Sequence, residues 1–216
     1  MQVRFRSHEE IEADAQHLLD RYALAKQWNP APPVPIERLI SFLGLRQEVL
    51  DLYNFLGAAN DGSGELLGAL CFKTGTIRVD SRIDPEDYPW LEGRFNFTYG
   101  HEVAHWVLHR DEYLAQAEQG TLFGTPPSDI VCRRSDKSER IEVQANRFAR
   151  CLLLPRGLVR SVWRAKVGTG AAIASDARRR ATRVVAEQFC TSIESTGYRL
   201  EELGLFAAKK QPDLGV

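Results

Sequence analysis

Apolar residues recur at helical spacing near the start of the chain, and this pattern predicts a helix over residues 8–27. Ser7 can cap that helix, and Glu10 stands three positions later, where it completes a capping box. The proline-rich stretch 29–35 must be extended, because proline fixes its own backbone and has no N–H to donate. A short second helix is expected over residues 36–43, since a glycine follows it.

The next part of the chain is typical of strands. Residues 45–58 predict one or two short strands, and residues 66–80 predict a hairpin with its turn near Thr74 and Gly75. In the second arm, Ile77 and Val79 alternate with polar neighbours, as expected where one face of a strand is buried. A small sheet is therefore expected ahead of the long helical patterns.

Helical patterns fill the rest of the chain. Two long ones start near residues 95–98 and at 139, and the second stops before Pro155. Shorter helices are expected over 157–166 and 176–188. Strands followed by helices predict an α+β fold class. We expect a first domain, a small helical lobe and a C-terminal tail, with the boundaries 1–155, 156–206 and 207–216.

Composition agrees with an ordinary globular protein, since 44% of the residues are hydrophobic and 26% are charged. No apolar run approaches the roughly 20 residues that span a bilayer, and the polar N-terminus does not resemble a secretory signal. The four cysteines are far apart and form no CxxC pair. We therefore expect reduced thiols, a cytoplasmic protein, and no zinc site built on cysteine.

The net charge of −1 conceals an asymmetry. Residues 156–200 hold nine basic and three acidic residues, which gives +6, and the remaining 19 basic and 26 acidic residues give −7. A basic lobe on an acidic body suggests a nucleic-acid or acidic-protein partner. The alternative is a solvated, arginine-rich helix with no partner at all.

Candidate chemistry is concentrated in the stretch "YGHEVAHWVLHR", residues 99–110. Residues four apart lie on the same face of a helix, so His101 and His105 can bind one metal ion together. Zinc with three protein ligands lowers the pKa of a water molecule in its open position to about 7. Glu102 can accept the proton of that water and pass it to a leaving amine, which is the chemistry of an HExxH motif.

His109 stands one further turn along, and geometry argues against it as the third ligand. Eight residues of helix span about 12 Å, which is too far from His101 for ligand bonds near 2 Å. His109 is expected either to line the cleft or support the ligands, or else to be polar surface.

A carboxylate from the next helix is the better third ligand, which gives a site with two histidines, one glutamate and one open position. The candidates are Glu139 and Glu142. Glu142 borders an apolar stripe that contains the small residues Ala145 and Ala149, where two helices can approach closely. Asn146 lies one turn further along the same face and can hydrogen-bond a ligand from behind.

The paired stretches "FNFTYGHEVAHWVLH" and "EVQANRFARCLLLP" resemble the ImmA/IrrE-type metallopeptidases, over roughly residues 8–155. The resemblance implies a zincin-like domain that binds one zinc ion, with His101, His105 and Glu142 as ligands and Glu102 as general base. It also implies that the hairpin edge beside the active-site helix binds substrate as an added strand. Tyr99 stands where the family usually has leucine; it precedes His101 by two residues, so it points away from the metal and no loss of activity is expected.

Residues 176–205 predict two helices separated by a tight turn, with Thr191 or Ser192 as cap of the second. The spacing is helix-turn-helix-like and resembles the segment that follows the peptidase domain in the same family. The second helix begins with few positive groups, so a structural or protein-docking role is favoured over direct DNA contact. Any nucleic-acid or partner contact is expected from the arginines that precede it, Arg178, Arg179, Arg180 and Arg183.

Together these features predict an intracellular zinc metalloendopeptidase. The family resemblance implies one or few protein substrates, typically a helix-turn-helix repressor whose cleavage derepresses stress, phage or mobile-element genes. The alternative is a non-catalytic DNA-binding or protein-interaction regulator, or a toxin–antitoxin-type module, on a zincin scaffold. Glu102 argues against these alternatives, because a structural metal needs no base.

Overall fold

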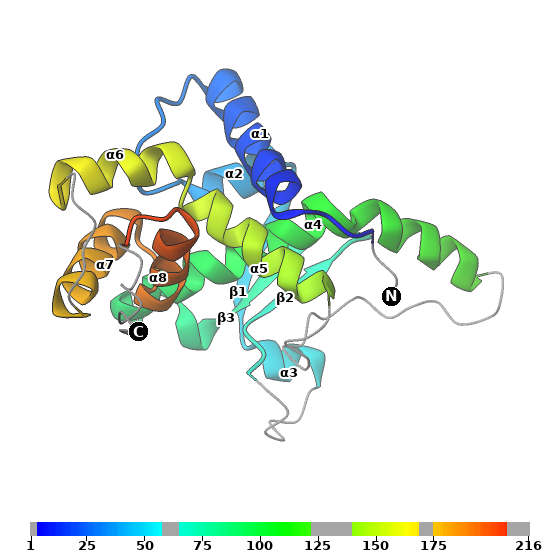
Figure 1. Cartoon of the computed structure of the whole chain (residues 1–216). Helices are drawn as coiled ribbons and strands as arrows, with labels where there is room; N and C mark the ends of the chain where they lie inside the picture. Colours follow the sequence, from blue (N-terminus) through cyan, green and yellow to red (C-terminus); the bar gives the residue numbers. More distant parts are fainter. Residues whose placement is uncertain (1–3, 58–64, 122–139, 169–174, 207–216) are drawn as a thin grey trace, which may run out of the picture.

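The computed structural model describes residues 4–57, 65–121, 140–168 and 175–206 (Figure 1). Their helices and strands follow one another in this order: α1 (His8–Lys26), α2 (Ile36–Phe42), β1 (Arg46–Leu50), α3 (Leu52–Leu56), β2 (Gly68–Cys71), β3 (Thr76–Asp80), the 3-10 helices η1 (Ser81–Ile83) and η2 (Pro89–Leu91), α4 (Glu92–Thr121), α5 (Arg140–Leu153), α6 (Arg156–Lys166), α7 (Ser175–Phe189) and α8 (Ile193–Glu202). A mostly helical chain with a small sheet is an α+β fold, as predicted.

The two N-terminal helices lie where the sequence pattern puts them. The side chain of Ser7 accepts a hydrogen bond from the backbone N–H of Glu10, and the Glu10 side chain accepts one from the backbone of Ser7. This confirms the predicted capping box. The predicted apolar stripe of α1 is buried against α5, and its members are Ile11, Ala15, Leu18, Leu19 and Tyr22.

The sheet has the strand order β1-β3-β2, with β1 parallel and β2 antiparallel to β3. The predicted hairpin is confirmed, and Gly75 in its turn has φ +61°, a conformation that favours glycine. The prediction of strands throughout 45–58 is wrong after residue 50. Asp51 caps the short helix α3 there by accepting a hydrogen bond from the backbone N–H of Asn54.

The long helix α4 begins directly after η2 and packs on the sheet, on α2 and on α5 (Figure 1). The main hydrophobic core lies between these elements and α1, and its large members include Leu39, Ile77, Tyr99 and Phe148. Although α4 has 30 residues, neither it nor any other helix of the described residues is long and apolar enough to cross a membrane.

Helices α6, α7 and α8 enclose a second apolar cluster, which includes Trp163, Val185, Phe189 and Leu200. The residues of the first cluster end at Leu153, and those of the second begin at Leu154. The predicted division into domains at residue 155 stays a prediction, because a separate core does not by itself make a separate folding unit. In Figure 1, α7 and α8 lie beside the first turns of α4.

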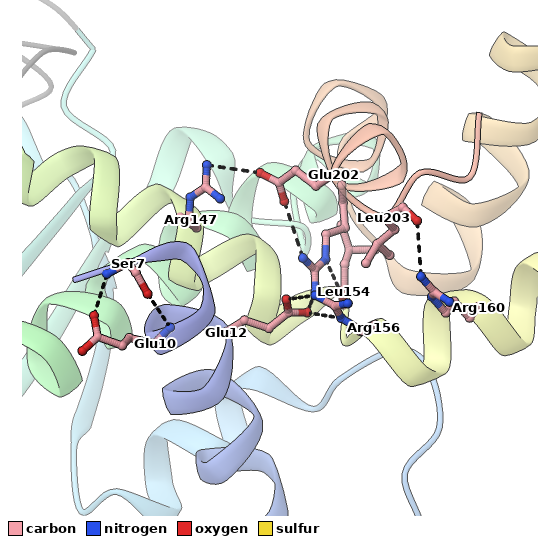
Figure 2. Close-up of polar contacts among 10 residues, drawn as sticks. Ser7, Glu10, Glu12, Arg147, Leu154, Arg156, Arg160, Glu202 and Leu203 are labelled. Atoms are coloured by element: carbon pink, nitrogen blue, oxygen red, sulfur yellow. Dashed lines mark hydrogen bonds and ion pairs between the residues drawn. The ribbon is translucent and has the colours of Figure 1, made fainter. Parts of the chain in front are cut away.

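A network of charged side chains joins α1, α5, α6 and α8 (Figure 2). At its centre Arg199 is only 2% exposed, and each nitrogen of its guanidinium group has an acceptor. It donates to Glu12 on α1 (2.6 Å), to the carbonyl of Leu154 (3.0 Å) and to Glu202 (3.5 Å). Arg156 also pairs with Glu12, so the lobe is tied to the first helix by two cations on one carboxylate.

Candidate metal centre

Helix α4 supports the histidine pair because its opposite side is held in the core. Tyr99 and Val103 are buried there, and Tyr99 packs edge-to-face on Phe95 with ring centroids 4.7 Å apart. Tyr99 therefore belongs to the core side of the helix, as expected. His101 and His105 come one turn apart from the same helix, and their Nε2 atoms lie 2.9 Å from each other.

Helix α5 brings Glu142 to the same point. Its Oε2 atom lies 3.1 Å from His101 Nε2, and its Oε1 atom lies 3.5 Å from His105 Nε2. One ligand atom from each of the three residues can be chosen so that all lie within 4.8 Å of one another. Glu139, the other candidate for a third ligand, lies outside the described residues.

Small residues allow the two helices to approach. A Cβ atom built on Gly100 would lie 3.4 Å from the Cβ of Ala149 and 3.3 Å from a methyl group of Leu153. Ala145 and Ala149 are both fully buried in this contact, as the apolar stripe of the sequence predicted. The carboxylate of Glu142 therefore reaches the histidines because the backbones of α4 and α5 pass close together.

Asn146 stands one turn after Glu142 and lies behind the first histidine. Its Oδ1 atom is 3.1 Å from Nδ1 of His101. An acceptor at this position holds the proton on Nδ1, which leaves Nε2 free to bind a cation. The predicted supporting position of Asn146 agrees with this geometry.

Glu102 lies beside the cluster and is 2% exposed. Burial raises the pKa of Glu102 to about 7; His101 opposes this rise and Glu142 adds to it. Its Oε2 atom is buried and has no hydrogen-bond partner among the described residues. A buried carboxylate oxygen without a donor is costly, so its position calls for a ligand or a water molecule.

The first residue of β2 makes room for this carboxylate. A Cβ atom built on Gly68 would lie 2.6 Å from Glu102 Oε1 and 2.7 Å from a methyl group of Thr98. A residue with a side chain therefore cannot replace Gly68 without moving the general-base candidate. Sequence reasoning missed Gly68, since nothing in the local pattern distinguishes it from other strand glycines.

A small cleft of about 30 Å³ opens between α4 and the start of β2. Its lining residues are Glu65, Leu67, Gly68, Phe97, Thr98, His101 and Glu102. Because β2 is at the edge of the sheet, its outer side faces away from β3. The cleft therefore joins the His101–Glu102 pair to a strand edge that pairs with no other strand of the described residues.

His109 is fully buried, so of the two expectations the polar-surface alternative is wrong. Its ring lies 5.5 Å from the ring of His105, between centroids. Burial lowers the pKa of His109 to about 4, which makes it a neutral imidazole at pH 7. The backbone of Ile141 approaches the ring, but neither ring nitrogen makes a hydrogen bond of good geometry within the described residues. His109 therefore supports the cluster from behind and does not belong to the group of ligand atoms.

The protonation of the two ligand histidines differs. Burial alone would lower the pKa of His101, but its hydrogen bond with Glu142 and the charge of Glu102 raise the pKa above its ordinary value. Burial lowers the pKa of His105 well below its ordinary value, and the neighbouring histidines add to this effect. The two pKa values are therefore shifted in opposite directions, with the neighbouring carboxylates stabilising a positive charge on His101 and burial opposing one on His105.

The donor set fits zinc. Two imidazole nitrogens and a carboxylate are common zinc ligands, at about 2.0–2.2 Å from the ion. In a tetrahedral site such bonds place the ligand atoms about 3.3 Å apart. The two Nε2 atoms lie 2.9 Å apart, and each faces a different oxygen of Glu142, at 3.1 Å from His101 and 3.5 Å from His105, so the three side chains surround one point at about this spacing.

The four arginines expected at a nucleic-acid or partner contact do not behave alike. Arg178 pairs with Glu201 at 3.0 Å and stacks on the ring of Phe206. Arg179, Arg180 and Arg183 are exposed. None of these four residues lies in the metal-ligand cluster.

Comparison with known proteins identifies the family. The model of the IrrE N-terminal-like domain, a peptidase family, matches residues 91–201, which is just over half of the chain. The match begins beside α4, contains both helices of the metal cluster and extends through most of α8. A search of curated proteins found no match. Family membership implies a metallopeptidase and a bound metal. The chain belongs to the IrrE N-terminal-like domain family, in agreement with the ImmA/IrrE resemblance of its motifs.

Proposed function

We propose that the protein is an intracellular zinc metalloendopeptidase with a zincin-like catalytic domain. One observation carries this proposal: His101, His105 and Glu142 converge on one point, and the unpartnered carboxylate of Glu102 lies beside it. A structural zinc site usually has four protein ligands, whereas a catalytic site has three and an open position. The three-residue cluster fits the second pattern.

Zinc in this site would act as a Lewis acid that lowers the pKa of water and polarises a peptide carbonyl. Glu102 accepts a proton from the attacking water and passes it to the amine that leaves. Burial raises the pKa of Glu102, whereas a bound cation would lower it again, so the loaded site favours the carboxylate form that accepts a proton. Asn146 keeps the proton of His101 on Nδ1, and His109 fills the space behind His105.

The substrate polypeptide is proposed to bind as an extended strand along the outer edge of β2, the edge strand of the described sheet. Backbone groups at a sheet edge can pair with a peptide of almost any sequence, so this edge supplies affinity more than selectivity. Because Gly68 has no side chain, the backbone of β2 lies close to the carboxylate of Glu102. A peptide bound along β2 would therefore pass near this carboxylate. The scissile carbonyl would then lie over the cleft lined by His101 and Glu102.

The family suggests the kind of substrate. We propose that it is a helix-turn-helix transcriptional repressor, cleavage of which derepresses stress, phage or mobile-element genes. The helical lobe supports recognition of a protein in this scheme. Its α7–α8 pair has helix-turn-helix-like spacing, and Ser192 caps α8 by accepting from the backbone N–H of Ser195, as one of the two predicted caps.

The second candidate is a regulator that binds DNA or protein without cleaving it. The exposed Arg179, Arg180 and Arg183 favour this alternative, because they lie on one helix and can contact phosphates. The same three arginines can equally dock on an acidic protein. A nearly buried base candidate beside the ligands favours catalysis, since a binding scaffold has no use for Glu102.

The test is a cleavage assay with the helix-turn-helix repressor encoded nearest to the gene. Zinc-loaded wild type, the metal-free protein and Glu102→Gln are each incubated with the purified repressor, and products are identified by mass spectrometry. The proposal predicts one or a few specific cuts by the zinc-loaded wild type alone, with fold and zinc retained in Glu102→Gln. A DNA shift without any cleavage would favour the regulator instead.

A further inference from the structure

A second hollow, of about 370 Å³, lies where the start of α4 meets the turn between α7 and α8. Its lining includes Trp90, Glu92, Arg183, Ala186, Cys190 and Ile193. None of these residues belongs to the metal cluster. A volume of this size lies in the range of pockets that bind small molecules, and it exceeds that of one side chain.

The walls of the hollow are fixed to each other by backbone contacts. A Cβ atom built on Gly93 would lie 2.7 Å from the carbonyl carbon of Thr191 and 2.8 Å from the nitrogen of Ser192. Beside this contact, the side chain of Asn96 donates a hydrogen bond of 3.0 Å to the carbonyl of Cys190. Helix α4 and the α7–α8 turn therefore cannot separate without losing close packing, and the hollow is preformed.

Apolar side chains are unusually exposed around it. Trp90 is 77% exposed, and its ring packs edge-to-face on that of Tyr88 with centroids 5.7 Å apart. Ile193, at the start of α8, is about half exposed on the other side of the hollow. The charged residues of the lining, Arg183 against Glu92 and Glu187, leave a net charge of −1, so the hollow disfavours an acidic side chain. Trp90, Ala186 and Ile193 give it an apolar surface on which an uncharged side chain can pack.

The hollow lies on the same side of α4 as the cleft beside the metal cluster. Gly93, Phe97 and His101 follow one another at intervals of four residues, so they form one stripe along the helix. Gly93 lines the hollow, whereas Phe97 and His101 line the cleft. Eight helical residues span about 12 Å, which is about four residues of an extended peptide.

We propose that this hollow, between η2, the start of α4 and the α7–α8 turn, is a substrate subsite. It binds a large apolar side chain of the substrate polypeptide, about three to five residues from the cleaved bond. This proposal rests on the proposed peptidase function and adds selectivity to it, because the sheet edge alone discriminates little between sequences. The lobe then takes part in substrate binding by forming one wall of this hollow.

The test uses a degenerate peptide library, with cleavage products of the full-length, zinc-loaded protein sequenced by mass spectrometry. We expect wild type to favour Leu, Ile, Met or Phe at one position three to five residues from the cut. Trp90→Ala and Ile193→Ala should each reduce this enrichment about tenfold, and Trp90→Phe should largely keep it. Leu24→Ala is the matched control, because Leu24 is an equally exposed apolar residue on α1, and it should leave the enrichment unchanged.

Each other outcome has a defined meaning. Cleavage with no apolar preference at that distance, or with a preference that Trp90→Ala retains, would overturn the subsite and leave the peptidase intact. If the zinc-loaded wild type cleaves no peptide, or cleaves no more than Glu102→Gln does, both the peptidase function and the subsite are overturned. Because Trp90 and Ile193 make few buried contacts, circular dichroism and thermal unfolding should show the variants folded.

Discussion

Two clusters of polar side chains are buried in this molecule, and they differ in how their hydrogen bonds are satisfied. Around Arg199, every guanidinium nitrogen has an acceptor, on Glu12, Leu154 or Glu202. Around His101 and Glu142, three ligand atoms face one another, and the Oε2 atom of Glu102 has no donor among the described residues. The first cluster is complete without a ligand, whereas the second is completed by one.

This difference separates stability from chemistry. The buried Arg199 holds α8 and the end of α5 against α1, and Arg156 at the start of α6 pairs with the same carboxylate, Glu12 (Figure 2). Unpaired donors and acceptors cost stability, and proteins keep them where a bound ion or substrate needs them. Changes in the metal cluster should therefore affect activity and metal binding, and changes in the Arg199 network should affect unfolding.

The largest effect is expected from Glu102→Gln. Loss of the proton carrier should reduce the rate of peptide cleavage by about 10³–10⁴-fold, while zinc stays bound. The metal-free variant should be as stable as wild type or more so, because an amide replaces a buried carboxylate. Cleavage of the peptide library and urea unfolding measure the two quantities. Glu112→Gln, the same change on the same helix, is the control. An equal loss of activity in this variant would show that Glu102 has no special role in cleavage.

Arg199→Ala should affect stability alone. The change leaves Glu12 and the carbonyl of Leu154 without their buried donor, so we expect the free energy of unfolding to fall by about 3 kcal/mol. Zinc affinity should remain that of wild type. The exposed Arg179→Ala in the same lobe should change stability by less than about 0.5 kcal/mol. Equal effects of the two substitutions in denaturant titrations would show that the Arg199 network adds no more to the free energy of unfolding than an exposed arginine does.

Asn146→Ala tests whether a residue that supports a ligand contributes to zinc affinity. Without the acceptor for its Nδ1 proton, His101 is free to rotate or change tautomer, and zinc affinity should fall about 10–100-fold. Glu142→Gln should reduce affinity further, since it alters a ligand itself. Competition with a fluorescent zinc chelator measures both. An order opposite to this one would contradict the assignment of Glu142 as ligand and Asn146 as its support.

The smallest effect concerns pH. Hydrogen bonds from Arg156 and Arg199 lower the pKa of Glu12 from 4.5 to about 2. The unfolded chain therefore binds this proton at a higher pH than the folded one, so the stabilisation is complete above about pH 4.5 and is lost as pH falls towards 2. Allowing for the partial exposure of Glu12, it amounts to on the order of 1–2 kcal/mol. Urea unfolding of metal-free wild type and Glu12→Gln should differ by this amount at pH 6, and the difference should shrink to a fraction of it at pH 2.5. A constant difference would contradict the shift.

The sequence predicts what depends on neighbours along the chain. The histidine pair, the base and the capping box are each defined within five residues, so spacing alone indicates them. The apolar stripe of α5 indicates which face meets α4 and so favours Glu142 and Asn146, but spacing left Glu139 open, and the family resemblance made the choice. The turn between α7 and α8 was predicted from local spacing, and of the two cap candidates, Thr191 and Ser192, the structure has Ser192.

What the sequence could not predict depends on contacts between distant residues. Glu12 and Arg199 are 187 positions apart, and no local pattern pairs them. Burial of His109 follows from packing of α5 and the N-terminal segment over α4, so a polar surface position was equally consistent with its spacing. Residues 52–56 form α3 instead of a strand because the Asp51 cap outweighs their β propensity. The parallel pairing of β1 with β3 likewise depends on the tertiary structure, because α3 and β2 lie between these strands in the sequence.

The most direct test of the metal centre is a crystal structure of zinc-loaded Glu102→Gln with anomalous data collected at the zinc edge. We predict a single zinc ion bonded to Nε2 of His101, Nε2 of His105 and the carboxylate of Glu142, at about 2.0–2.2 Å, with the fourth position facing residue 102 and free of protein ligands. Zinc bound elsewhere, or a fourth side chain that closes the open position, would contradict the account.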